Sequence, residues 1–303
     1  MSNRSQSIAT YLMIGLVIGA VAGYFASGPL TYNSQIASLK NRIVELEGQS
    51  TTELSGTLSI AGSTTVLPIS QEIANMFMQL HTKVQVSVAG GGSGHGVKAA
   101  GSGEVDIGEA SRNIKDSEWL SYPDLVIFSV GKDSVAVVVN PNNPVSGSLD
   151  LTLEEVSKVF SGEITNWSEL GGDDHEIEVY TREEGSGTRE VFELYCMTPF
   201  DAEFAAGASV KPSNGEMRAS VAGNKYGIAY VSLGYVDDTV RAAKVGGVKA
   251  TVENVNSGTY PITRVLWMLT KGMPSPLEKA FIEYVQSSEG QAIVEELGYI
   301  PIY

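Results

Sequence analysis

Hydrophobic positions from about residue 54 onward switch repeatedly between two periods. The runs GTLSIAG, KVQVSVA and VDIGEA alternate or are mainly apolar, which predicts β-strands because successive side chains of a strand point to opposite faces. Between these runs, LPISQEIANMFMQLH and GVKAAGSG have the spacing of a helix with one buried face. This order of strand and helix predicts an α/β fold with a mainly parallel sheet.

A second group of elements follows the same pattern. LVIFSV and SVAVVVN predict strands that close the first group, and EIEVYT and YGIAYV predict strands of the second. Helices are predicted for LTLEEVSKVF and GSGTREVFELY. The chain ends with a strand, RVLWMLT, and two helices, PLEKAFIEYVQ and SEGQAIVEEL. The length of 303 residues leaves room for one or two domains with their own cores.

The N-terminus has a different pattern, which predicts a membrane anchor or signal within residues 1–30. Residues 8–26 read IATYLMIGLVIGAVAGYFA, and this stretch is long enough to cross a bilayer as a helix. Its length favours an uncleaved anchor over a secretory signal, although Ala22 and Ala26 leave cleavage open. Arg4 precedes the span, and no early positive charge follows it, which places the bulk of the chain outside the cell. The predicted location is the outer face of the cytoplasmic membrane, or the periplasm or medium after cleavage.

Residues 31–53 are predicted to form a helical stalk and a linker. Apolar side chains recur there at three- and four-residue steps, at Ile36, Leu39, Ile43 and Leu46. Two heptads are too few to establish a coiled coil. The polar segment QSTTELSG then leads into the globular part.

Composition excludes several classes of function. The chain has 35 acidic against 20 basic side chains, which argues against a nucleic-acid partner because binding a phosphate backbone requires a basic face. Cys196 is the single cysteine, so a disulfide within the chain is excluded and a buried thiol is expected. The three histidines, His81, His95 and His175, lack the spacing of metal ligands, and no cofactor or metal is predicted.

Three turns between a strand and a helix carry the candidate chemistry. They are AGSTTVLP, AGGGSGHG and TREEGSGTRE. A helix start has unpaired N–H groups and a partial positive charge, so an anion is stabilised there, and hydroxyls add donors without adding charge. Ser, Thr and Gly are also ordinary helix-capping residues, but three such turns, two with an arginine near, favour an oxyanion site. The candidate ligand-binding residues are Ser63, Thr64, Thr65, Ser93, Ser111, Arg112, Arg182, Ser186, Gly187 and Thr188.

Other sites built on glycine-rich turns do not fit. The sequence has no GxxxxGK[ST] for an ATP-binding loop, and GGGSGHG lacks the GxGxxG spacing of a dinucleotide site. A nucleophile elbow, GxSxG, also fails, because His95 and Thr188 stand where its last glycine is required.

The motifs GSTTVLP, GGGSGHGVK, DIGEASR and TREEGSGTRE, in this order, are similar to those of PstS-type phosphate-binding proteins of ABC importers. The resemblance covers about residues 54–303. It implies a type II periplasmic-binding-protein fold, in which two α/β lobes enclose phosphate in a cleft. Lobe one would comprise residues 54–134 and 233–303, and lobe two residues 135–232. The partners implied are inorganic phosphate and a membrane permease, and no enzymatic activity is implied.

The resemblance also implies individual roles. Thr64, Thr65 and Ser93 would donate from the first lobe, with Ser63 as a further donor. Arg182, Ser186, Gly187 and Thr188 would complete the site from the second lobe, and Glu184 stands where the family often has an acidic residue that orients the arginine.

The sequence departs from the family at one position. Arg112 occupies the place of an aspartate that, in long-form members, accepts the proton of hydrogen phosphate. Such an acceptor explains rejection of sulfate, which has no proton to donate. Its role would pass to Glu109, to Glu184 or to a hydroxyl, or discrimination would be weaker. Three alternatives therefore stay open: a binding protein for sulfate, molybdate or tungstate; a surface phosphatase using Ser93 or Ser186; and a sensor or adhesive protein with this fold.

Overall fold

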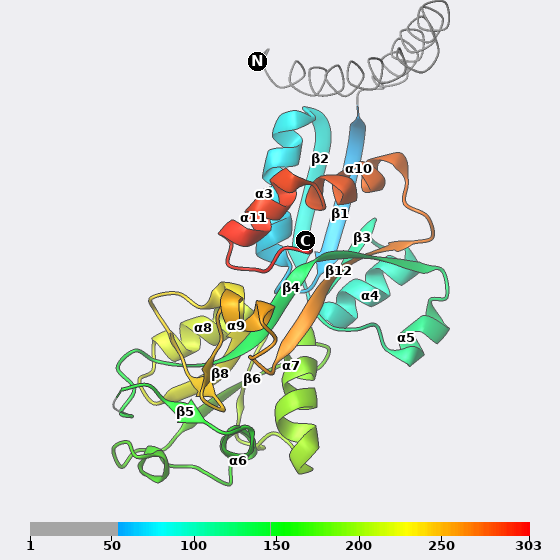
Figure 1. The fold of residues 1–303 in the computed structure, drawn as a ribbon. Coiled ribbons are helices and arrows are strands. Elements are labelled where there is room, and N and C mark those ends of the chain that lie inside the picture. Colours follow the sequence, from blue (N-terminus) through cyan, green and yellow to red (C-terminus); the bar gives the residue numbers. More distant parts are fainter. Residues whose placement is uncertain (1–53, 146) are drawn as a thin grey trace, which may run out of the picture. The chain divides into compact units, whose positions relative to one another are not determined.

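The computed structural model describes residues 54–145 and 147–303 (Figure 1). The predicted membrane span at residues 8–26 and the predicted stalk lie outside these residues. Within the part of the chain that is described, no helix is long and apolar enough to cross a membrane.

The first lobe is built from three parallel strands and the helices that cover them. Strand β1 pairs in parallel with β2 on one side and with β3 on the other. Helix α3 covers one face of this sheet together with α10 and α11, and α4 and α5 cover the other (Figure 1). The elements are β1 (Ser55–Gly62), α3 (Leu67–Leu80), β2 (Lys83–Gly90), α4 (Ser93–Ser102), β3 (Ile107–Ala110), α5 (Asp116–Ser121), α10 (Pro276–Val285) and α11 (Ser288–Glu296).

Two long strands run between the lobes. They are β4 (Leu125–Val139) and β12 (Thr263–Lys271), which pair in antiparallel fashion. The sequence predicts two strands, LVIFSV and SVAVVVN, where the structure has the single strand β4. The intervening Gly131, Lys132 and Asp133 continue the ladder, so this segment is a crossing strand rather than a turn.

The second lobe repeats the parallel arrangement around β6. Strand β8 continues the sheet from β4 in antiparallel fashion, and the full order is β2-β1-β3-β12-β4-β8-β6-β7. The sheet is therefore parallel around β1 and around β6 but antiparallel where β12 and β4 join them, whereas the sequence predicts a mainly parallel sheet. The main elements are α6 (Leu153–Ser161), β6 (Glu178–Arg182), α7 (Gly187–Phe192), β7 (Ser209–Lys211), α8 (Asn214–Ala222) and β8 (Gly227–Ser232).

Short elements complete the second lobe. Helix α7 continues into a π-helical turn, η2 (Glu193–Met197), followed by η3 (Thr198–Phe200). A separate small sheet has the order β11-β10-β5, and β9 pairs with β4. The remaining elements are β5 (Asp150–Leu151), η1 (Trp167–Leu170), η4 (Leu233–Tyr235), β9 (Arg241–Ala242), β10 (Lys244–Val245), β11 (Val248–Lys249) and α9 (Val252–Asn256).

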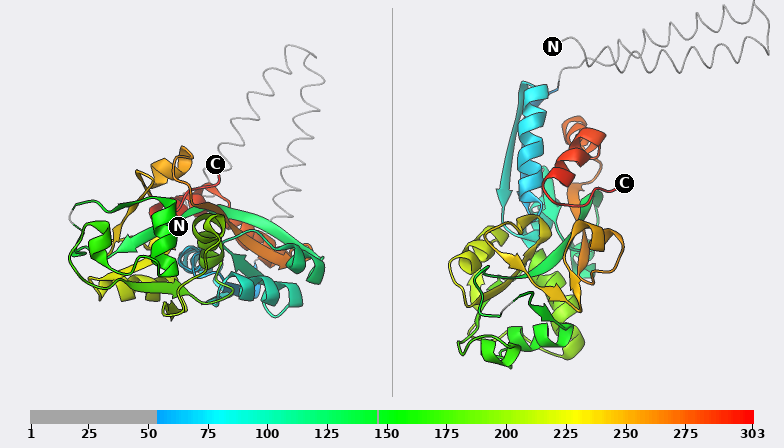
Figure 2. Two further views of the ribbon diagram at one scale, coloured as in Figure 1. Left: turned by 90° about the horizontal axis from the view of Figure 1, so that it is seen from below. Right: turned by 60° about the vertical axis from the view of Figure 1, so that its left-hand side comes forward.

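The hydrophobic core divides at the crossing strands. Residues 135–139 of β4 belong to the core of the second lobe, whereas Val130 belongs to that of the first. The right view of Figure 2 shows the two groups of elements at opposite ends of the crossing strands. Val240, Val245 and Tyr260 pack in the core of the second lobe. Residues 240–262 therefore belong with the second lobe by packing, although the sequence assigns them to the first, because β9 and β10 attach to β4 and β5.

Candidate functional site

The predicted turns of the first lobe stand at the carboxyl ends of adjacent parallel strands. Ser63 follows β1, Ser93 begins the helix after β2, and Ser111 follows β3. The three side chains are buried. Ser93 Oγ accepts a hydrogen bond of 3.0 Å from the backbone N–H of Ser111 and lies 3.3 Å from Ser111 Oγ. The parallel sheet thus brings together side chains that are up to 48 residues apart in sequence.

The helix starts have the local chemistry that the sequence indicates. Ser63 Oγ accepts from the backbone N–H of Thr65, 3.2 Å away, at the turn before α3. Gly92 precedes α4 with φ of 86°, a conformation that glycine adopts without a steric penalty. Ser186 caps α7 by accepting from the backbone N–H of Arg189. Each start therefore fixes a buried hydroxyl beside a helix N-terminus.

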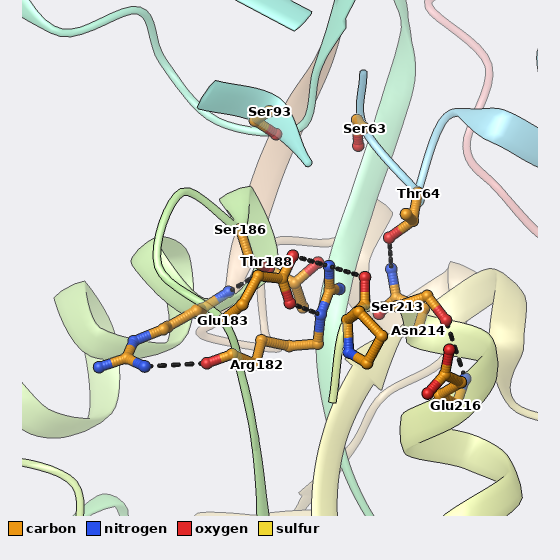
Figure 3. A network of polar contacts seen from close by, with 12 residues as sticks. Ser63, Thr64, Ser93, Arg182, Glu183, Ser186, Thr188, Ser213, Asn214 and Glu216 are labelled. Carbon is orange, nitrogen blue, oxygen red and sulfur yellow. Dashed lines mark hydrogen bonds and ion pairs between the residues drawn. The ribbon is translucent and has the colours of Figure 1, made fainter. Parts of the chain in front are cut away.

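The two lobes meet directly at these turns, and Figure 3 shows one of the contacts, between Asn214 of the second lobe and Thr64 of the first. Thr65 Oγ1 of the first lobe lies 3.2 Å from Thr188 Oγ1 of the second. The backbone N–H of Gly94 donates to the carbonyl of Gly185 across the same boundary, at 3.0 Å. A side chain at Gly187 would overlap the hydroxyl of Ser93. The site residues of both lobes therefore form a single cluster, with the lobes closed on one another.

Arg182 is buried at the end of β6, with its side chain 1% exposed. Its guanidinium forms two hydrogen bonds to Glu183, of 2.8 and 2.7 Å. The sequence assigns the orienting role to Glu184, so the structure corrects that assignment by one position. Within the described residues, Nη1 of Arg182 has no hydrogen-bond partner. Arg182 therefore offers a buried donor whose orientation Glu183 fixes.

Arg112 is held at the edge of the cluster by two carboxylates. It donates to both oxygens of Glu118, at 2.7 Å each, and forms an ion pair of 2.8 Å with Glu190 of the second lobe. Lys115 also pairs with Glu190, at 2.9 Å. Burial alone would lower the pKa of Arg112, but Glu118 and Glu190 raise it above its ordinary value. The sequence suggests that Arg112 contacts the bound anion, and this contact stays a prediction. The partners of Arg112 in the structure are the carboxylates of Glu118 and Glu190.

Three residues of the cluster are absent from the sequence-based set. Arg264 is the second residue of β12, Asp133 lies opposite it on β4, and Asn214 is the first residue of α8. Asn214 Nδ2 donates to Thr65 Oγ1 at 3.0 Å and to Thr64 Oγ1 at 3.3 Å. A signal for Asn214 exists in the sequence, since Ser213 caps α8 in a fourth turn of the same type, PSNGE. Arg264 stands directly before the apolar run VLWML, which is the corresponding signal for a buried charge, whereas Asp133 lies in the polar stretch GKDS and gives no such signal.

Glu109 lies behind the cluster on β3. It is buried and hydrogen-bonds to the hydroxyl of Ser70 in α3, while its other carboxyl oxygen has no partner among the described residues. Burial raises the pKa of Glu109 to about 8, with the Ser70 hydrogen bond opposing the rise. Glu109 is therefore mostly protonated at neutral pH.

Comparison with known proteins places this geometry in a family. A model of the PBP superfamily domain matches residues 47–289. A phosphate-binding protein PstS from Bacillus subtilis is 35% identical over 250 residues, which cover 82% of this chain and 81% of that protein. The chain belongs to the PstS family.

Solved PstS-like structures share its fold. The crystal structure of a phosphate ABC transporter substrate-binding protein from Clostridium perfringens, described as having bound phosphate, is similar with a TM-score of 0.76 and 36% identity. The match covers 82% of this chain and 100% of that one. An ABC-type phosphate transport receptor from Vibrio cholerae has a TM-score of 0.65 at 33% identity, covering 80% and 99% of the two chains. These likenesses confirm the predicted two-lobed α/β fold and the resemblance to PstS-type proteins.

The remaining chemistry-bearing residues lie apart from the cluster or are inert. Cys196 is buried in the core of the second lobe, as predicted, and burial raises its pKa. Among residues 54–145 and 147–303, no group of three His, Cys, Asp or Glu side chains could hold a metal ion. The hydrogen bonds recorded for the hydroxyls of Ser93 and Ser186 involve a serine and backbone N–H groups, and none involves a base.

Proposed function

We propose that this protein captures inorganic phosphate outside the cytoplasm and delivers it to an ABC importer. The proposal is carried by one observation: buried hydroxyl and guanidinium donors from both lobes form a single cluster in a chain of the PstS family. The relative from Clostridium perfringens, described with bound phosphate, supports the same ligand. Because the protein is a binding protein, no bond of the ligand is broken.

The ligand contacts that we propose follow from the cluster. Hydroxyls and helix N-termini supply neutral donors, and Arg182 supplies a charged one through the unpaired Nη1. Each hydrogen bond to a charged group contributes on the order of 1.5–3 kcal/mol, so several suffice for a dissociation constant near or below micromolar. The proposed ligand-binding residues remain Ser63, Thr64, Thr65, Ser93, Ser111, Arg112, Arg182, Ser186, Gly187 and Thr188.

Closure of the lobes completes this site. Phosphate would bind the turns of one lobe first, and the other lobe would then close over it. Closure removes water from the donors and strengthens each charge-assisted hydrogen bond. The closed form would then dock on a membrane permease. The contacts between Thr65 and Thr188 and between Gly94 and Gly185 are those that we expect to form on closure.

We further propose that the N-terminal segment anchors the protein to the outer face of the cytoplasmic membrane. The apolar run at residues 8–26 supports this proposal. Extraction of native membranes tests it: the protein should stay with the membrane in high salt and carbonate and enter solution only in detergent. Release by salt alone, or a mature N-terminus beyond residue 26, would contradict it.

A second candidate ligand is another tetrahedral oxyanion, such as sulfate. It is favoured by the state of the acidic side chains near the cluster, since the carboxylates of Asp133 and Glu183 are each bound to an arginine and burial keeps Glu109 mostly protonated. A site without a free carboxylate acceptor has less reason to reject an anion that carries no proton.

Calorimetric titration of the purified chain with phosphate, sulfate, arsenate and molybdate decides between these ligands. We expect phosphate and its close analogue arsenate to bind near or below micromolar concentration, and sulfate and molybdate to bind more weakly. If sulfate or molybdate bound more tightly than phosphate, that anion would be the ligand instead of phosphate. A chain that binds none of the four would refute the proposed function.

A further inference from the structure

Arg264 and Asp133 form a buried ion pair on the two strands that connect the lobes. They are directly opposite each other in the β4–β12 ladder. The Nε and Nη2 atoms of Arg264 both donate to Asp133 Oδ2, at 2.9 and 2.7 Å. The two side chains are 2% and 0% exposed. Burial raises the pKa of Asp133, and the guanidinium beside it opposes that rise.

The outer edge of the Arg264 guanidinium is directed to the hydroxyl cluster. Nη2 donates to Thr65 Oγ1 at 3.0 Å, and Nη1 donates to Thr188 Oγ1 at 3.0 Å and to Ser111 Oγ at 3.3 Å. Thr65 and Ser111 belong to the first lobe and Thr188 to the second. A single side chain on a crossing strand therefore contacts turns of both lobes.

These hydrogen bonds decide how the hydroxyls can act. A hydroxyl has two lone pairs and one proton, and an arginine N–H can only donate. Thr65 Oγ1 accepts from Arg264 and also from Asn214, so both of its lone pairs are used and it can act further only as a donor. In the structure its proton is directed toward Thr188 Oγ1, 3.2 Å away, and an anion bound between the lobes would take that place. Thr188 and Ser111 each give one lone pair to Arg264. The guanidinium thus directs hydroxyl protons away from itself, which is the orientation that an oxyanion requires.

We propose that Arg264 is a positioning residue for the bound anion. It aligns the hydroxyls of Thr65, Thr188 and Ser111 as donors, and Asp133 holds it in place. This inference rests on the proposed function, since it concerns the same site. It assigns to Arg264 a role beyond neutralising Asp133. A buried ion pair that serves only packing can often be replaced by uncharged residues of similar size without loss of stability, so a loss of phosphate affinity on such a replacement would reveal the further role.

The test compares phosphate binding in the full-length chain and in variants, by calorimetry, with thermal unfolding measured for each. R264M alone would leave Asp133 buried and unpaired, so the deciding variant is the double substitution R264M/D133N, which removes both charges. We expect this variant to fold and to bind phosphate at least about 30-fold more weakly, which corresponds to about 2 kcal/mol. R264K keeps the charge next to Asp133 but loses the planar fork, and we expect an intermediate loss of about tenfold.

The matched control is E154Q/K158M, which removes an exposed ion pair on α6 and should bind phosphate as the wild type does. Binding by R264M/D133N within about threefold of the wild type would overturn the inference. If the double variant does not unfold cooperatively, R264K decides: affinity within about threefold of the wild type overturns the inference, and a loss of about tenfold supports it. A wild-type chain that binds no phosphate would instead refute the proposed function, so the two failures are distinct.

Discussion

Two arginine-centred ion-pair networks join the lobes, and they differ in depth. In the inner network, Arg264 and Asp133 are almost fully buried and lie against the hydroxyls of the site. In the outer network, Arg112 is itself only 5% exposed, but its partners Glu118 and Glu190 are each 18% exposed, and half-exposed Lys115 joins them. The inner network lies within the ladder of the crossing strands, whereas the outer network links α5 and the loop before it to α7.

The difference in depth separates two functions that arginine can serve. A buried charge must be paired, so removing one partner is costly and the geometry of the pair is fixed. A pair near the surface is screened by water and salt and contributes little to stability by itself. We infer that Arg264 of the inner network positions the ligand, whereas the ion pairs of the outer network favour the closed arrangement of the lobes.

The largest effect is expected from R182A, which removes a buried guanidinium whose Nη1 has no partner among the described residues. Phosphate affinity should fall by about 100-fold or more, because truncating one partner of a buried, hydrogen-bonded charge pair costs about 2–5 kcal/mol. Calorimetry measures the loss of affinity. R218A is the control: it removes a half-exposed arginine of α8 that pairs with Asp237 at the surface, and its phosphate affinity should stay close to that of the wild type. An unchanged affinity in R182A would exclude Arg182 from the site.

Glu109 shows what burial does to a carboxyl that has no arginine. Its pKa is about 8 in the folded chain against an ordinary 4.5. A raised pKa means that the neutral form is favoured by folding, so this contribution to stability is complete below pH 4.5 and is lost as the pH rises toward 8. E109Q has no carboxyl to ionise, so it should not lose this stability. Between pH 5 and pH 8 the free energy of unfolding of the wild type should therefore fall by about 3 kcal/mol more than that of E109Q. Urea unfolding at both pH values checks this, and parallel pH profiles would contradict it.

The close approach of the lobes is tested by G187A. A β-carbon there would overlap the hydroxyl of Ser93 and lie 2.8 Å from Ser111 Oγ. The lobes could then close only with strain of about 1–3 kcal/mol, so phosphate affinity should fall by about 10- to 100-fold. G207A is the control, because a β-carbon at Gly207 meets no atom within 4 Å. Equal affinities of the two variants would show that the lobes need not meet at Gly187.

The smallest effect is expected from E190Q in the outer network. It removes the carboxylate that Arg112 and Lys115 share across the lobes. Phosphate affinity should fall by about two- to fivefold at low salt and by less at high salt, as for other partly exposed pairs. Calorimetry at two salt concentrations measures both values. A loss as large as that of R182A would show that the two networks do not differ in function.

Local patterns revealed the elements of the fold and the turns of the site, because both depend on short-range periodicity and capping. Ser93 and Ser186 stand at helix starts, as the glycine-rich motifs predict. Their convergence follows from the parallel strands, whose carboxyl ends meet at one edge. The motif order, shared with the PstS family, carried the two-lobed arrangement that periodicity alone does not contain.

Long-range pairings could not be obtained in this way. Arg264 and Asp133 are 131 residues apart, and only the register of β4 with β12 makes them partners. The choice of Glu183 over Glu184 depends on side-chain direction at the end of β6, which the sequence does not specify. Residues 240–262 return to the second lobe through strands only two residues long, which leave no readable periodicity.

The connection between the lobes through β4 has a mechanical consequence. A flexible loop would let the lobes rotate in many directions, whereas this strand keeps its hydrogen-bonded ladder with β12 on one side of the boundary and with β8 on the other. The opening that we propose would therefore twist and bend a continuous ribbon, which resists bending in most directions. We expect such a hinge to restrict the molecule to a narrow range of open geometries and to bring the two halves of the site back to the same alignment on closing.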